Sequence, residues 1–140
     1  MKWVTWENIV VDRMACIWLI RRWLDPNAEF MFIPVGEKSL PKHGEPFDIP
    51  GARYSHHGGH CTFHTLLKEY KIKDPVLLHI AQIVDEADEI QPVNVEPAAP
   101  GLDLICRGLR QISQDDFEAM ERGSLLYDAL YAQLKLDSAK

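Results

Sequence analysis

Residues 74–89 read DPVLLHIAQIVDEADE and contain the clearest helix signal in the chain. Asp74 is a favourable N-cap, and Pro75 suits the first helical position because the N–H that proline lacks has no partner there. We therefore predict a helix from Pro75 to about Glu89. At about 100° per residue its apolar side chains form one broad face. They are Leu77, Ile80, Ala81, Ile83, Val84 and Ala87.

Asp88 is the unusual residue of this helix. It falls about 20° from Leu77, inside the apolar face, whereas Glu86 points to solvent and Asp85 lies at the boundary. A buried carboxylate is costly unless it is paired, hydrogen-bonded or bound to a cation. Three interpretations remain open for Asp88. It forms an ion pair or a helix-end hydrogen bond, it binds a metal ion, or it serves acid–base chemistry or anion binding.

Strands and helices alternate early in the chain, and helices dominate later. Strands are predicted at 2–6 and 28–34, with a proline-containing loop over 35–50 and an extended piece at 52–55. Further helices are predicted at 13–24 with Asp12 as N-cap, at 62–70 capped by Thr62, around 102–112, and from Ser113 to about 134. We expect one α+β domain over residues 1–140, a small sheet packed against about five helices.

Composition excludes several functions. The chain has 140 residues, 46% of them hydrophobic, and a net charge of −6, which disfavours nucleic acid as a partner. The densest basic cluster, Arg21 and Arg22 with Arg13, is too small for a nucleic-acid surface. No apolar run reaches about 18 residues, and the N-terminus lacks the pattern of a signal peptide. We therefore expect a cytoplasmic protein without a membrane partner.

The cysteines and tryptophans allow further expectations. Three cysteines stand far apart, which argues against a disulfide framework or a thiolate zinc site. Cys16 and Cys106 fall in apolar helical patterns and are expected to be buried. Four tryptophans crowd the first two predicted elements. They fit either the core or a subunit interface of a homo-oligomer.

Residues 55–63 read SHHGGHCTF and form the second candidate region. Histidines 56, 57, 60 and 64 could bind zinc, nickel or copper, although a histidine-rich tract is as often a surface or structural feature. Gly58-Gly59 permits a turn. A helix starting after it would lower the pKa of the Cys61 thiol or accept an oxyanion. An ordinary capped helix start would also explain the pattern.

Two further charged residues are candidates. Arg13 shares a helix face with Cys16, and Asp128 lies at the edge of the apolar face of the last helix. We expect Arg13 to form a buried pair with Asp88 or Asp128. Asp128 could instead bind a ligand or pair with Arg21.

Four blocks of the sequence resemble the C-terminal domain of the chromate-resistance protein ChrB family. They occur in the same order and cover nearly the whole chain: residues 11–22 (VDRMACIWLIRR), 56–63 (HHGGHCTF), 83–88 (IVDEAD) and 127–131 (YDALY). Longer proteins of that family carry an additional N-terminal region and are described as chromate-responsive regulators of efflux operons. We expect this chain to lack that region, and therefore not to regulate by direct DNA binding.

The resemblance marks particular positions as matching the motifs of the family. They are Asp12, Arg13, Arg21, Arg22, His56, Cys61, Asp88, Tyr127 and Asp128. His57, His60 and His64 do not match a motif position. The resemblance therefore leaves His56 and Asp88 as the pair that helix geometry also favours.

Our leading hypothesis is a metal-dependent domain acting in the chromate or oxyanion response. His56 and Asp88 would hold a divalent ion, together with Asp12 or Asp128, and Arg21 and Arg22 would attract a small anionic ligand. A second hypothesis is a lyase or hydrolase for a small anionic organic molecule, with catalytic roles for Arg13, Cys61, Tyr127 and Asp128. A third is a metal-free oxyanion sensor that binds through its arginines, and a fourth is a thiol reductant that uses Cys61.

Overall fold

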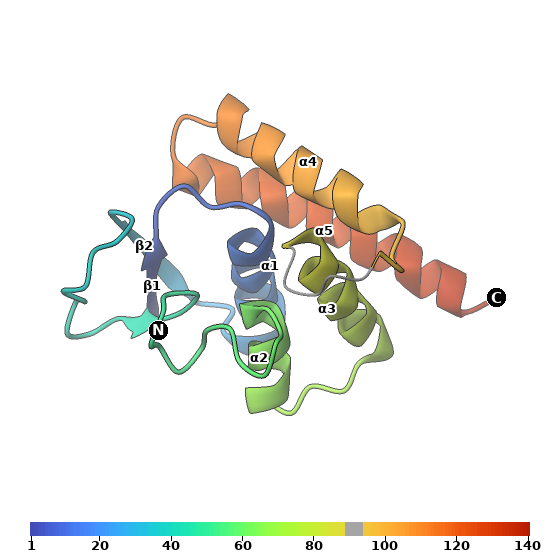
Figure 1. Cartoon of the computed structure of the whole chain (residues 1–140), viewed down its shortest axis with the longest axis horizontal. Helices are drawn as coiled ribbons and strands as arrows, with labels where there is room; N and C mark the ends of the chain where they lie inside the picture. The colour runs from blue at the N-terminus through green and yellow to red at the C-terminus, as the bar shows by residue number, and fades with distance from the viewer. Residues whose placement is uncertain (89–93) are drawn as a thin grey trace.

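A computed structural model describes residues 1–88 and 94–140. In this part of the chain the ordered elements are β1 (Lys2–Trp6), α1 (Val11–Leu19), the π-helical turn η1 (Ile20–Leu24), β2 (Glu29–Ile33), β3 (Glu45–Pro46), α2 (Thr62–Glu69), α3 (Pro75–Ala87), α4 (Ala98–Ile112) and α5 (Asp116–Ser138). The predicted helix-dominated α+β fold is confirmed (Figure 1).

The sheet is small and parallel, in the order β2-β1-β3. Lys2 of β1 pairs with Glu29 of β2, and Trp3 of β1 pairs with Glu45 of β3. A parallel neighbour requires a crossover connection, and α1 with η1 supplies it between β1 and β2. β3 lies within residues 35–50, so the prediction of an uninterrupted loop there is wrong. Two residues containing a proline give almost no strand signal.

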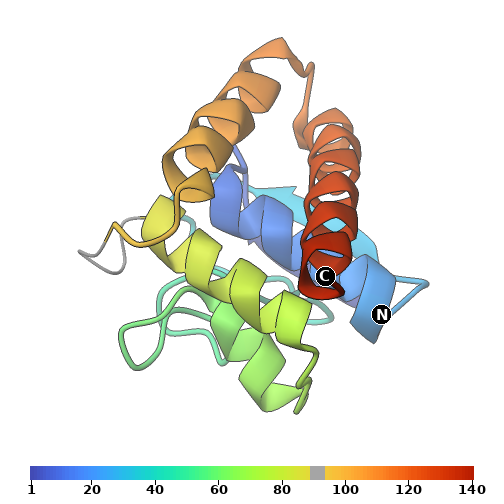
Figure 2. The same cartoon turned by 90° about the vertical axis from the view of Figure 1, so that its right-hand side faces the viewer.

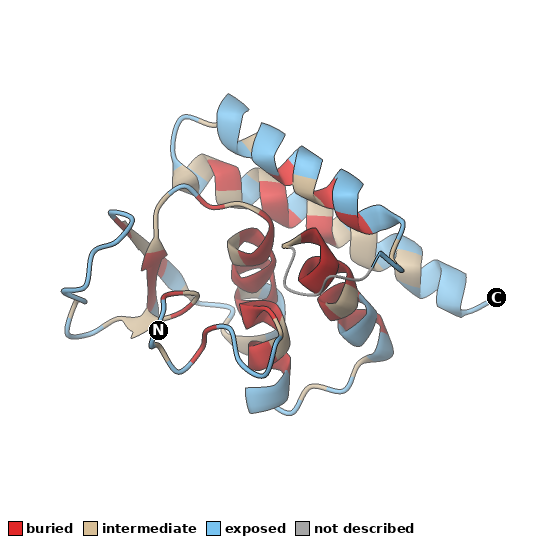
Figure 3. Ribbon diagram, in the orientation of Figure 1, coloured by how far each residue is buried: buried red, intermediate tan, exposed pale blue. Residues whose placement is uncertain are grey.

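Helix α1 is the centre of the fold, because nearly every residue from Val11 to Leu19 is buried (Figure 3). Figure 2 shows α4 and α5 running in opposite directions on one side of it, with α2 and α3 on another. Trp18 stacks on Phe63 of α2 and on Tyr127 of α5. A Cβ added to Gly123 of α5 would lie 3.1 Å from Met14, so this glycine permits close packing of α5 on α1.

Several local predictions are confirmed and others are wrong. Asp74 caps α3 by accepting the N–H groups of Val76 and Leu77. The predicted helix extension to Glu89 lies outside the described residues. The last helix begins at Asp116 with Asp115 as its cap, not at Ser113, which ends α4. No helix of the described residues has the length and apolarity needed to span a membrane.

Candidate functional site

The start of α2 is held by carboxylates from two other helices. Asp12 of α1 accepts the N–H groups of Thr62 and Phe63 at 3.0 and 3.1 Å. Asp85 of α3 accepts the N–H of Cys61 at 2.7 Å. The predictions that Asp12 caps its own helix and that Thr62 caps α2 are therefore both wrong. Local sequence rules do not detect a cap that comes from 50 residues away.

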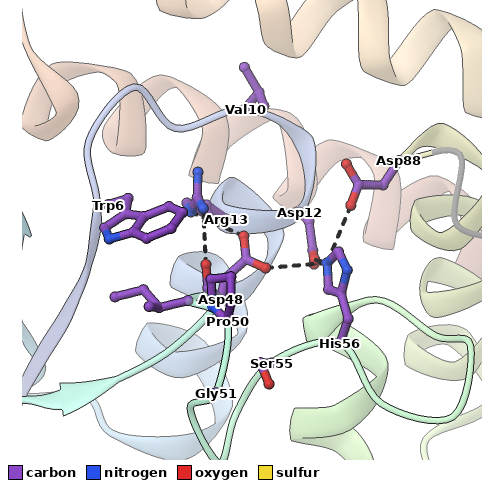
Figure 4. A pocket seen from close by; sticks show the side chains of 11 residues that line it. Trp6, Val10, Asp12, Arg13, Asp48, Pro50, Gly51, Ser55, His56 and Asp88 are labelled. Atoms are coloured by element: carbon purple, nitrogen blue, oxygen red, sulfur yellow. Dashed lines mark hydrogen bonds and ion pairs between the residues drawn. The ribbon is translucent and has the colours of Figure 1, made fainter. Parts of the chain in front are cut away.

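His56 lies at the meeting point of three carboxylates (Figure 4). Its Nε2 is 3.2 Å from Asp12 Oδ2, 3.3 Å from Asp48 Oδ1 and 3.5 Å from Asp88 Oδ2. Asp12, Asp48 and His56 each offer one possible ligand atom. These three atoms all lie within 4.8 Å of one another, a spacing that a metal ion could bridge. Two of the three predicted metal ligands, His56 and Asp12, thus belong to this group together with Asp48, and the third, Asp88, lies beside it, 3.5 Å from His56.

Asp48 is the residue that the sequence did not reveal. It lies in the loop after β3 and has a φ of 52°, a conformation that aspartate tolerates better than most residues. Its carboxylate accepts the Thr62 hydroxyl at 2.7 Å and pairs with the Arg13 guanidinium at 3.0 Å. The predicted pairing of Arg13 with Asp88 or Asp128 is therefore wrong. Arg13 also lies over the Trp6 ring, 5.7 Å from its centroid.

The pKa shifts in this cluster reflect burial together with crowded negative charge. Hydrogen bonds to Asp12 and Asp48 raise the pKa of His56 to about 10. Burial, together with the charges of Asp12 and Asp48, raises the pKa of Asp88 to about 7. Burial also raises the pKa of Asp12, with a further contribution from Asp48. The part of these shifts that comes from neighbouring carboxylates is a field that would also attract a metal cation.

The cluster opens into a pocket of about 520 Å³, called here the first pocket. Its lining comprises Trp6, Val10, Asp12, Arg13, Asp48, Ile49, Pro50, Gly51, Ser55, His56 and Asp88. Figure 4 shows Asp88 on one side of His56, with Arg13 and Trp6 on the other. The charged groups thus adjoin an apolar wall.

The acidic residues of α3 differ from their predicted positions. Asp85 is 1% exposed and Glu86 is 8% exposed, so neither lies in solvent. The Glu86 carboxylate accepts the N–H groups of Val95 and Glu96. The half-buried Asp88 follows α3 as its C-cap residue and points toward His56, as expected.

Cys61 lies in the core at the start of α2 and is fully buried. Burial, with the charges of Asp12 and Asp85, raises the pKa of its thiol well above the ordinary value. The predicted lowering of the Cys61 pKa is therefore wrong. Burial, and after it the carboxylates that hold the helix start, outweigh the positive end of the helix dipole, and the buried thiol is not accessible as a nucleophile.

The remaining predicted residues lie where α1 and η1 meet α5. Arg21 pairs with Glu121 at 2.9 Å, and Arg22 pairs with Asp128 at 2.9 Å, so Asp128 does not pair with Arg13 or Arg21. Asp128 also accepts the Trp18 indole N–H at 2.7 Å.

Tyr127 lies in the same contact between α1 and α5. It is fully buried, and its hydroxyl donates to the Val11 carbonyl. In the described part of the chain, other residues line the first pocket, and the lining does not include Arg21, Arg22, Tyr127 or Asp128. Their contacts join helices to one another.

Fold and pocket together define a helix-dominated α+β domain with a carboxylate–histidine cluster at one opening. The chain belongs to the ChrB family, because the family model described as "ChrB, C-terminal domain" matches residues 3–134. Protein ChrB from Cupriavidus metallidurans is 30% identical over 133 residues, which are 93% of this chain and 40% of that protein. The chain thus spans about two fifths of the length of this curated relative. No solved structure matches the chain.

Proposed function

We propose that this domain binds a divalent metal ion in the first pocket and serves the response to chromate or a related oxyanion. The observation that carries the metal site is the convergence of Asp12, Asp48 and Asp88 on His56. Carboxylate oxygens with one imidazole suit a divalent first-row ion such as Mn²⁺, Fe²⁺ or Zn²⁺. The link to chromate rests on the resemblance to the ChrB family.

The surrounding contacts support a metal site because they orient the ligands. Asp12 is fixed by two backbone N–H groups, and Asp48 is fixed by Arg13 and the Thr62 hydroxyl. Second contacts of this kind position metal ligands and tune their basicity. His56 would turn its Nε2 from the carboxylates to the ion.

The charges of the pocket favour a metal-dependent anion site over a metal-free one. Three carboxylates face His56 and Arg13, so the metal-free pocket repels an anion when all three are ionised. A divalent ion held by neutral His56 would balance the charges of the three carboxylates and Arg13, which removes the repulsion and lets an anion bind at the ion next to Arg13. Arg21 and Arg22, the predicted anion ligands, pair with Glu121 and Asp128 outside the lining of the first pocket.

The size of the pocket favours a second candidate, a metal-dependent hydrolase or lyase acting on a small anionic organic molecule. A volume of about 520 Å³ far exceeds the need of a bare oxyanion, since a water takes up about 30 Å³ in the liquid. Trp6, Ile49 and Pro50 form an apolar wall that an inorganic anion would not use. A metal ion there would polarise a carbonyl group or activate a water, and Arg13 would hold a carboxylate.

Elemental analysis of purified protein tests the metal site. We expect about one equivalent of a divalent metal in the wild type after reconstitution, and loss of the metal in His56→Ala and Asp88→Asn. Asp103→Asn on α4 is the matched control, because Asp103 contacts Arg107 outside the pocket. Equal metal content in all four proteins, or none in the wild type, would overturn the proposal.

A further inference from the structure

A second pocket, of about 660 Å³, lies beside the same helix start. It is lined by Arg53, His57, Gly58, His60, His64, Thr65, Lys68 and Glu69. Gly58 and Gly59 have φ values of 59° and 76° and form a tight turn, closed by two backbone hydrogen bonds between His57 and His60. The turn places two imidazoles on one edge of the pocket.

Asp85 fixes the orientation of His60. The buried carboxylate lies 2.6 Å from His60 Nδ1 and also accepts the Cys61 N–H. With Nδ1 directed at Asp85, the opposite edge of the ring, which carries Nε2, is available to the pocket. His64 stacks on His60 with the ring centroids 3.8 Å apart. The two rings thus form one wall, backed by a carboxylate that solvent does not reach.

The charges at the second pocket have the opposite sign to those at the first. Arg53 and Lys68 bring two permanent positive charges to its lining. Glu69 is the acidic residue of the lining, and its carboxylate is paired with Arg53 at 3.2 Å. Because Asp85 lies behind His60, the donors that face the pocket are ammonium, guanidinium and imidazole groups. The ammonium and guanidinium groups repel a metal cation and attract an anion, to which an imidazole N–H can also donate.

We propose that the second pocket binds a small oxyanion, of the phosphate or sulfate type, through Arg53, Lys68 and His60. Arg53 and Lys68 would supply charge-assisted hydrogen bonds, and His60 would donate or accept through Nε2 according to its protonation. The binding needs no metal ion. It is therefore independent of the metal site proposed for the first pocket.

Calorimetric titration of chelator-treated protein with inorganic phosphate, and separately with sulfate, tests this site. We expect Lys68→Gln and Arg53→Gln each to weaken binding about tenfold, the loss typical of one charge-assisted hydrogen bond. Lys71→Gln is the matched control, since Lys71 lies just beyond the end of α2 and outside the lining of the second pocket. Both lysines and Arg53 are exposed, so the three variants should fold normally.

The variants separate a built site from general attraction to positive charge. Equal weakening in all three variants would overturn the proposal, as would no binding of either anion at millimolar concentration. Asp88→Asn separates the two pockets, because it alters the first pocket alone and should leave phosphate affinity within about twofold. If phosphate binding needed added metal or fell with Asp88→Asn, the anion would belong to the first pocket and the proposal would fail.

Discussion

Asp12 and Asp85 hold the same helix start from two different helices, and each also contacts a histidine. Asp12 binds the N–H groups of Thr62 and Phe63 and contacts His56, whereas Asp85 binds the Cys61 N–H and contacts His60. The positive end of the α2 dipole favours both carboxylates. One structural device thus orients one histidine toward each pocket, and this explains why His56 and His60 serve different pockets despite their closeness in sequence.

Asp85→Asn should destabilise the protein while preserving the fold. The amide oxygen can still accept the Cys61 N–H, and the amide nitrogen can donate to His60 Nδ1 once the ring carries its proton on Nε2, so a hydrogen bond to a charged acceptor becomes a neutral one. We expect a loss of about 1 kcal/mol, the usual difference between a charge-assisted and a neutral hydrogen bond. Urea denaturation measures it, with Asp103→Asn as an exposed control. A stability equal to the wild type would show that the buried contact contributes nothing.

Metal affinity should rise with pH. Without metal, the pKa of His56 is about 10 and that of Asp88 about 7, and both must lose their protons to bind an ion. Between pH 6 and pH 8 we expect the affinity for Mn²⁺ to increase by at least about tenfold per pH unit. Calorimetry at pH 6, 7 and 8 in buffers of different ionisation enthalpy would also count the released protons. An affinity independent of pH would contradict the assignment of His56 as a ligand.

The stability of the metal-free protein should change with pH in the opposite direction. The pKa of His56 is raised from 6.5 to about 10, so its stabilising contribution is complete below about pH 6.5 and is lost as the pH approaches 10. Because the side chain is 44% exposed, solvent screening should limit this loss to about 1–2 kcal/mol. Urea titrations of chelator-treated protein at pH 6.5 and 9.5 measure it. His56→Gln should reduce the difference, and an unchanged difference would assign it to other groups.

Sequence reasoning succeeded where the determining interactions are local. Asp74-Pro75 fixed the start of α3, because an N-cap and a first-turn proline act within a few residues. The turn at Gly58-Gly59 follows from glycine's access to positive φ. Helical periodicity placed Asp88 on the inward side, and the structure confirms that it meets His56.

The same reasoning failed where distant residues decide the outcome. Asp48 lies in a loop with no periodicity, and its partners Arg13 and Thr62 are 35 and 14 residues away in the chain. Glu86 is buried because the segment at Val95 and Glu96 returns over α3, which a helical wheel cannot show. Capping of α2 by Asp12 likewise depends on how α1 and α2 pack.

The cysteines should be unreactive in the native protein. Cys16, Cys61 and Cys106 are all buried, and burial raises the pKa of each thiol. Thiol reagents attack the thiolate, so both access and ionisation oppose the reaction. At pH 8 we expect a disulfide reagent to label less than about one thiol per native protein molecule. In denaturant all three cysteines should react. Rapid native labelling that disappears in Cys61→Ser would restore the thiol hypothesis.

Tyr127→Phe separates a structural role for this tyrosine from a catalytic one. Its hydroxyl donates to the Val11 carbonyl at 2.7 Å, one residue before Asp12. Phenylalanine keeps the stacking on Trp18 but leaves that carbonyl without this donor, so we expect a loss of about 1–2 kcal/mol of stability. Because the ring is fully buried and outside the first pocket, metal content should stay within error of the wild type. Denaturation and elemental analysis on the same preparations test both statements. A variant of unchanged stability that lost its metal would place Tyr127 in the site, whereas the expected pair of results confines its role to fixing α5 on the start of α1.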